Sequence, residues 1–170
     1  MAQQQISASE VTQRLKAGEQ IASILGLSDT QVQTIAVLAY NQYEQGRYDN
    51  AEKLFAGITA LDKKNPIGYA GLGAVAMAKK PPDLATAYTN LSKAVELNPN
   101  DATVQANLGE VLLRQGKLEE AKPHLEKAFQ LDPERKDRSA NRARAIVAGL
   151  DMVIKEVQKR AEPVQRAKAS

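Results

Sequence analysis

Apolar residues recur along most of this chain at intervals of three and four, in short segments separated by polar turns. That interval places the apolar side chains on one face of an α-helix, so each segment predicts a helix with one buried side. Glycine and proline punctuate the turns, as at Gly46, Pro99 and Gly116. The pattern therefore predicts an all-α fold built from short helices in succession.

Small residues repeat at a spacing of about 34 positions and mark three helical hairpins. The recurring residues are, copy by copy, Leu38-Ala39, Gly46, Tyr48, Ala51 and Phe55; Tyr69, Leu72-Gly73, Ala87, Leu91, Ala94 and Pro99; and Leu108-Gly109, Ala121, Leu125, Ala128 and Pro133. This is the tetratricopeptide pattern, in which Gly or Ala lies where two antiparallel helices cross. We expect three such hairpins within 29–135, at about 32–65, 66–101 and 102–135, that form a short right-handed solenoid.

An N-terminal helical arm, residues 1–28, precedes the hairpins. Ser7 and Glu10 form a potential capping box, and the helix predicted over 7–26 ends at Gly26, although Gly18 weakens its interior. A second capping box, Ser28 with Gln31, opens the first hairpin. The apolar side of the arm suggests pairing in a homodimer and consists of Val11, Leu15, Ile21, Ile24 and Leu25.

A C-terminal capping helix over 136–162 should cover the last hairpin, because terminal repeats need a cover for their apolar face. Asp132-Pro133 favours a helix start, and we expect a disordered tail over 163–170. The apolar positions of this helix are Ile146, Val147, Leu150, Val153, Ile154 and Val157. A basic amphipathic helix can also lie on a membrane, but this apolar stripe is needed for packing, so no stable membrane association is expected.

The second hairpin has a turn two residues longer than the third, at Lys79-Lys80-Pro81-Pro82-Asp83. Asp83 is a suitable N-cap for the following helix. A tolerated insertion accounts for this turn better than a contact loop does.

Composition excludes several kinds of site. The chain has 170 residues, 43% of them hydrophobic, which suits one domain, and it has no cysteine, so disulfides and thiolate metal sites are excluded. His124, the single histidine, lacks a second His or Cys for a metal site and is expected on a helix surface. We find neither a Gly-rich phosphate loop nor a Ser-His-Asp set. We therefore expect no enzyme activity, no metal and no cofactor.

The net charge of +3 is unevenly distributed. Residues 1–133 hold 13 basic and 15 acidic residues, a net of −2, while residues 134–170 hold 10 basic and 5 acidic residues, a net of +5. A nucleic-acid-binding tail is one interpretation, but a solvated helix face is favoured, so no nucleic acid partner is expected. The N-terminus lacks the basic start and apolar run of a signal peptide, and no segment reaches about 18 apolar residues. We expect a cytoplasmic protein.

In this fold the first helix of each hairpin faces a concave groove. The predicted groove residues are Ala36, Tyr40, Tyr43, Ile67, Ala70, Ala74, Met77, Ala106, Glu110 and Leu113. They are mostly apolar and include neither Lys nor Arg, so the groove suits an extended peptide with spaced hydrophobic side chains. A clamp for an acidic C-terminus is excluded, because Ala36 and Tyr40 stand where such a clamp has cations. The alternative is that some of these residues pack under the N-terminal helix.

The first hairpin carries a more specific sequence, Ala39-Tyr40-Asn41-Gln42-Tyr43-Glu44-Gln45-Gly46-Arg47-Tyr48, followed by Ala51, Phe55, Leu61-Asp62 and Gly71-Leu72-Gly73-Ala74. Over about residues 8–155 the chain resembles the class II chaperones of bacterial type III secretion systems. The resemblance implies a cytosolic chaperone that keeps a hydrophobic translocator protein soluble before export. It also implies that part of the client lies extended in the groove and that the helical arm takes part in dimerisation.

Two other functions compete with this one. A tetratricopeptide scaffold would assemble proteins through its outer surface, without a secreted client, and would tolerate substitutions in the groove. A nucleic-acid-associated protein would use the basic tail and would lose binding steeply with added salt.

Overall fold

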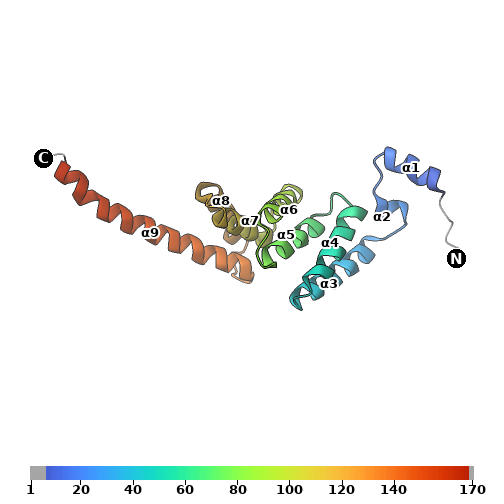
Figure 1. Cartoon of the computed structure of the whole chain (residues 1–170), viewed down its shortest axis with the longest axis horizontal. Helices are drawn as coiled ribbons and strands as arrows, with labels where there is room; N and C mark the ends of the chain where they lie inside the picture. Colours follow the sequence, from blue (N-terminus) through green and yellow to red (C-terminus); the bar gives the residue numbers. More distant parts are fainter. Residues whose placement is uncertain (1–6, 169–170) are drawn as a thin grey trace. The chain divides into compact units, whose positions relative to one another are not determined.

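The computed structural model describes residues 7–168, and their side chains as far as Glu156. Every regular element in this part of the chain is a helix, which confirms the predicted all-α class (Figure 1). The helices are α1 (Ala8–Lys16), α2 (Ile21–Ile24), α3 (Asp29–Glu44), α4 (Tyr48–Leu61), α5 (Pro66–Ala78), α6 (Leu84–Leu97), α7 (Ala102–Arg114), α8 (Leu118–Gln130) and α9 (Arg138–Lys168).

The predicted hairpins are α3–α4, α5–α6 and α7–α8, and the two helices of each pair pack along one another. The chain divides into two compact units, residues 1–98 and 99–170. The first unit contains the arm and two hairpins. The second contains the third hairpin and α9.

The core of the first unit shows why small residues repeat. Phe55 is fully buried in α4, and a Cβ added to Gly71 of α5 would lie 2.2 Å from its ring. At Gly73 an added Cβ would lie 2.5 Å from Leu91 of α6. These distances are well inside van der Waals contact, so only glycine permits the helices to approach this closely.

The third hairpin repeats this arrangement in the second unit. A Cβ at Gly109 of α7 would lie 2.6 Å from Leu125 of α8. Ala121, Leu125 and Ala128 are fully buried on the inner side of α8. The recurring small residues are therefore a steric requirement of the helix crossings.

The arm is two helices, and the single helix predicted over 7–26 is wrong. Gly18 has a φ of +85°, a left-handed conformation that L-residues rarely adopt, and it separates α1 from α2. The predicted ends are confirmed: the Glu10 N–H donates to Ser7 Oγ at 3.2 Å, and Gly26 has a φ of +68°. The Ser28–Gln31 capping box is also present in full at the start of α3.

The helix after the third hairpin does not start at Asp132-Pro133 as expected. The buried Asp132 carboxylate instead accepts the backbone N–H groups of Lys136 and Asp137, at 2.9 and 3.0 Å, and closes a turn. Asp137 caps α9, because its carboxylate accepts the N–H of Ala140 at 2.8 Å. A side chain that satisfies a turn cannot also cap a helix six residues later.

The helix α9 extends through Pro163 to Lys168, into the segment expected to be disordered. The residues after Pro163 include Gln, Arg, Ala and Lys, which have high helix propensity. Residues 169 and 170 of the expected tail, residues 1–6 of the arm and the side chain of Val157 lie outside the described parts of the chain.

The start of α9 is fixed to α8 by Arg144. Its guanidinium donates to the carbonyl oxygens of Phe129 and Asp132 at 3.2 and 3.1 Å, and lies 5.4 Å from the centre of the Phe129 ring. The Phe129 carbonyl lies in the last turn of α8, where backbone acceptors lack helical partners, and the Asp132 carbonyl follows just after it. The first part of α9 therefore completes the end of the third hairpin.

Candidate functional site

In the first unit, six of the predicted groove residues are at least partly exposed on neighbouring first helices of the hairpins. We call this surface the α3–α5 face; it consists of Tyr40, Tyr43, Ile67, Ala70, Ala74 and Met77. The spacing of three, four and three along α5 keeps its members on one side of that helix. The helices α3 and α5 contact each other, so the two rows are adjacent.

Tyr40 is the largest exposed side chain of this face. Its ring packs edge-on against Phe55, with the centroids 5.0 Å apart and the planes at 74°, while 41% of the residue stays exposed. Phe55 in turn lies against Gly71 of α5. Tyr43 is held in a similar way by Tyr48, at 5.6 Å between centroids. Both rings are therefore positioned by the core before any ligand arrives.

Two predicted groove residues do not belong to any exposed surface. Ala36 is 3% exposed and Ala106 is fully buried, so neither offers area to a ligand. Ala36 lies in the cluster formed with Val32, Ala39 and Phe55. Their positions within the repeat predicted that these two alanines would line the groove. Neighbouring helices approach each other closely at both residues, so the alanines lie in the core instead.

The predicted groove residues of the second unit are Ala106, Glu110 and Leu113 of α7. Glu110 is only 9% exposed, because Arg142 of α9 forms an ion pair with its carboxylate. Arg142 also donates to Asn107 Oδ1 at 3.3 Å. Glu110 therefore attaches α9 to α7, whereas Leu113 stays partly exposed.

A cavity of about 670 Å³ lies beside the start of α3 and was not predicted from the sequence. It forms because α2 folds back toward α4, where Gln20 Oε1 accepts the backbone N–H of Lys63 at 3.1 Å. The charged side chains that line it are Asp29 and Asp62, beside apolar residues such as Leu27. Such a lining suits an uncharged or cationic group better than an anionic one.

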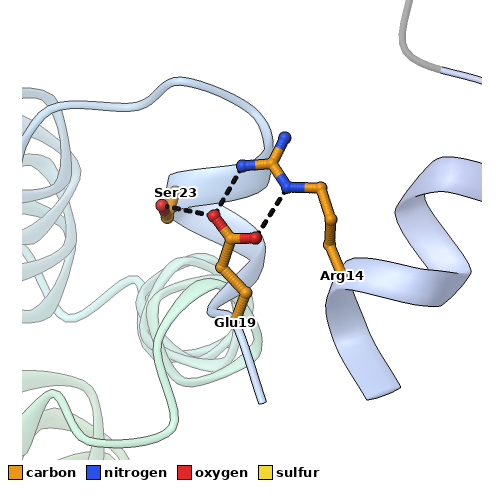
Figure 2. Close-up of polar contacts among 3 residues, drawn as sticks. All are labelled: Arg14, Glu19 and Ser23. Atoms are coloured by element: carbon orange, nitrogen blue, oxygen red, sulfur yellow. Dashed lines mark hydrogen bonds and ion pairs between the residues drawn. The ribbon is translucent and has the colours of Figure 1, made fainter. Parts of the chain in front are cut away.

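Figure 2 shows how the two helices of the arm are joined. Arg14 of α1 donates from Nε and Nη2 to the Glu19 carboxylate at 2.6 and 2.5 Å, and Ser23 Oγ of α2 donates to the same carboxylate at 3.1 Å. The hydrogen bonds raise the pKa of Arg14 and lower the pKa of Glu19. This bidentate contact spans Gly18 and fixes the angle between α1 and α2.

The apolar residues predicted to dimerise through the arm do not share one surface. Ile24 is 2% exposed and belongs to the core of the first unit, because the break at Gly18 turns α2 inward. Leu15 and Leu25 are 42% and 56% exposed, and Val11 and Ile21 are partly buried. A partner chain would therefore meet chiefly α1 and Leu25.

His124 lies on α8 and is half-buried there. Its Nδ1 lies 2.7 Å from Gln105 Oε1, and Gln105 Nε2 donates to the carbonyl of Pro99 at 2.9 Å. Burial lowers the pKa of His124. The contact assigns a structural function to this histidine.

Among the described residues, no group of three or more His, Cys, Asp or Glu side chains is placed to bind a metal ion. None of the described helices combines the length and apolar content that crossing a bilayer requires.

Comparisons with known proteins place these features in context. A tetratricopeptide repeat model matches residues 80–135. Low calcium response locus protein H of Yersinia pestis is 32% identical over 117 residues, which cover 69% of this chain and 68% of that protein.

Solved structures agree with the sequence match. The translocator chaperone SycD of Yersinia enterocolitica is 27% identical, with a TM-score of 0.66 over 78% of this chain and 98% of that one. PcrH, in complex with the chaperone binding region of PopB, is 26% identical, with a TM-score of 0.60 over 71% and 97% of the two chains. SycD in complex with a peptide of the translocator YopD is 25% identical, with a TM-score of 0.62 over 77% and 97%.

Proposed function

This chain belongs to the family of low calcium response locus protein H, the tetratricopeptide chaperones of type III secretion translocators, and we propose that it binds an extended apolar segment of a translocator. In doing so it would keep that client soluble in the cytoplasm before export. The mechanism is equilibrium binding without enzymatic turnover. The translocator chaperones reported above favour this function over the scaffold alternative.

The observation that carries the proposal is the α3–α5 face. It presents apolar side chains in two adjacent rows, and its two tyrosines are already fixed by ring contacts with Phe55 and Tyr48. A tyrosine held in place loses little rotamer freedom on binding, and it offers a hydroxyl to a peptide backbone. This is a suitable surface for a segment with apolar side chains spaced along an extended chain.

The expected affinity is moderate. Burial of two or three client side chains, at about 25 cal/mol per Å² of apolar area, contributes several kcal/mol before ordering costs are subtracted. A micromolar dissociation constant corresponds to about −8 kcal/mol. Binding of this strength holds a client during storage and releases it for export.

The cavity beside α2 extends the proposed site toward the arm. Gln33, which is exposed on α3, lines it together with Asp29 and Asp62. We expect a client residue with an uncharged or cationic end to enter here. A homodimer formed through Leu15 and Leu25 would use a different part of the arm, so client binding and pairing need not compete.

Co-expression tests the proposed function. The chain would be produced together with each translocator of its own secretion system, and the soluble fraction of the translocator measured by quantitative blotting. We expect soluble translocator only when the chain is present, in a complex that survives gel filtration. The Tyr40→Ala, Met77→Glu double variant should lose most of this effect.

Matched substitutions elsewhere provide the control. Tyr88 lies on α6, the second helix of its hairpin, and Met152 is 72% exposed on α9. The Tyr88→Ala, Met152→Glu double variant removes the same groups and should keep the translocator soluble. Equal losses in both double variants would contradict the α3–α5 face as the site.

A further inference from the structure

The cavity beside the start of α3 offers two kinds of contact to a lysine or arginine side chain. Part of its lining is apolar: Ala22 and Val32 are buried in the core of the first unit, and Leu27 packs against that core. The rest of the lining is polar and includes Asp29 and Asp62. Lys and Arg side chains lay their aliphatic stems on apolar surface and keep the charged end in polar surroundings. The cavity provides both within a volume of about 670 Å³.

The two acids also provide hydrogen-bond acceptors for a cation. The N–H of Lys64 donates to Asp62 Oδ1 at 2.8 Å, and Oδ2 of the same carboxylate stays available. Within the described part of the chain, the Asp29 carboxylate accepts no hydrogen bond, and neither acid forms an ion pair. Lys and Arg side chains carry donors alone, so these carboxylate oxygens are suitable partners for them.

The neighbouring cations do not neutralise the two acids. Lys63 and Lys64 follow one of them in the chain, but both are exposed and neither lines the cavity. Arg14 is held by the carboxylate of Glu19, which also accepts a hydrogen bond from Ser23, a residue of the lining. Among the described residues, the cavity lining thus contains two acids and no base, which favours a cationic ligand over an anionic one.

The start of α3 does not reverse this preference. The N-terminus of a helix attracts anions through its unpaired N–H groups and its dipole. Here the capping box uses two N–H groups, because Ser28 donates to Gln31 Oε1 at 2.8 Å and Gln31 donates to Ser28 Oγ at 3.3 Å. Asp29 adds a negative charge in the first turn. An anionic client group would therefore meet a capped helix end beside a carboxylate.

The cavity and the α3–α5 face share one side of α3. Asp29, Gln33, Tyr40 and Tyr43 follow one another at intervals of four, seven and three residues, which places them on the same side of the helix. Gln33 lines the cavity and precedes Tyr40 in this row. One client segment can therefore contact the tyrosines and the cavity together.

We propose that the cavity binds a Lys or Arg side chain of the client and so fixes the register in which the apolar segment lies. This inference rests on the proposed function, because it concerns the same client segment. Apolar contacts alone tolerate several registers, whereas an ion pair favours one.

The geometry of α3 sets the spacing that the client needs. Asp29 and Tyr40 lie about 16 Å apart along the helix axis. An extended chain advances about 3.3 Å per residue. The basic residue should therefore lie about four to six positions from the apolar residue that contacts Tyr40.

Calorimetry of the translocator's chaperone-binding segment against the full chain tests this proposal. The Asp29→Asn, Asp62→Asn double variant removes both charges and keeps the shape of the side chains, including the Oδ1 acceptor of residue 62. We expect its affinity for the segment to fall about tenfold at low salt. The difference from the unmodified chain should shrink as salt is added, because salt screens the attraction between charges.

The Glu44→Gln, Asp49→Asn double variant is the matched control. Both acids are exposed in the first unit and lie outside the cavity lining, so the variant changes the net charge equally. It should bind the segment like the unmodified chain. Circular dichroism of each variant checks that its helicity is unchanged.

A second series identifies the client residue that enters the cavity. Each Lys and Arg of the segment is replaced by Gln in turn, and the affinity is measured for the unmodified chain and for the Asp29→Asn, Asp62→Asn variant. One replacement, at the expected spacing, should weaken binding to the unmodified chain about tenfold. The same replacement should leave binding to the double variant unchanged, because the two groups then no longer interact.

Four results would overturn the proposal. They are unchanged affinity in the Asp29→Asn, Asp62→Asn variant, an equal loss in the control variant, a loss that is coupled to no basic residue of the segment, and tight binding of a segment without Lys or Arg. The Tyr40→Ala variant separates these results from a failure of the proposed function. Weaker binding of Tyr40→Ala, with unchanged binding of the cavity variant, would overturn the cavity proposal alone. A segment that does not bind the unmodified chain would overturn the proposed function itself.

Discussion

At Gly71 a single missing side chain decides how closely two helices pack. An added Cβ would lie 2.2 Å from the ring of Phe55, which is fully buried. We expect Gly71→Ala to lower the free energy of unfolding by about 2–3 kcal/mol, as measured by urea denaturation. The ring that supports Tyr40 would shift as well, so client binding should also weaken.

Gly57 provides the matched control for this prediction. It lies within α4, and a Cβ added there would meet nothing within 4 Å. Gly57→Ala should raise the free energy of unfolding by about 0.5–1 kcal/mol, because alanine favours the helix. A similar loss of stability in both variants would contradict the steric account of the helix crossing.

His124 should make the stability of the fold depend on pH. Burial lowers the pKa of His124 below its ordinary value of 6.5, so below that pH the unfolded chain binds a proton that the folded chain resists. The free energy of unfolding should therefore fall as the pH is lowered through 6.5. We expect His124→Gln to make the fall between pH 7.5 and 5.5 shallower in urea denaturation. An unchanged slope would show that the imidazole is freely protonated in the folded chain.

At the scale of helices, the Arg14–Glu19 contact sets the position of α1. The helix α1 has no buried residues, so this contact across Gly18 is the main constraint on it among the described interactions. Arg14→Ala should raise hydrogen exchange throughout α1 and leave the global free energy of unfolding nearly unchanged, since exposed ion pairs contribute little to it. Lys16→Ala is the matched control and should leave hydrogen exchange in α1 unchanged. Equal exchange in the two variants would contradict the conclusion that the Arg14–Glu19 contact holds α1 in position.

Sequence periodicity predicted the hairpins well, because small residues at helix crossings are required by sterics at Gly71, Gly73 and Gly109. The N-caps at Ser28 and Asp83 were also predicted correctly, because such a cap depends only on neighbouring residues in the sequence. The Asp83 carboxylate accepts the N–H of Thr86 at 3.0 Å. The local sequence could not show that the Asp132 carboxylate would accept hydrogen bonds within a turn. That contact depends on the direction in which the chain continues after α8.

The candidate site was predictable only in part. The exposed positions of the α3–α5 face follow from their place in the repeat. The burial of Ala36 and Ala106 depends on the distance between neighbouring helices, and the ion pair of Glu110 depends on where α9 packs. The cavity beside α2 requires the turn at Gly18, where the sequence indicated only a weak point in a helix.

At the scale of the whole molecule, the charge asymmetry has a structural interpretation. The net charge of residues 134–170 is +5, and several of these cations have partners in the second unit: Arg142 pairs with Glu110, and Arg144 binds carbonyls at the end of α8. These two basic residues thus attach α9 to the third hairpin. These contacts give Arg142 and Arg144 a structural role.

Calorimetry of a translocator's chaperone-binding segment against the full chain and its Tyr40→Ala variant tests the central claim most directly. The account predicts a roughly micromolar dissociation constant for the unmodified chain and a loss of about tenfold, near 1.4 kcal/mol, for Tyr40→Ala. Tyr88→Ala should bind like the unmodified chain. Unchanged affinity in the Tyr40→Ala variant, with helicity intact, would contradict the α3–α5 face as the client site.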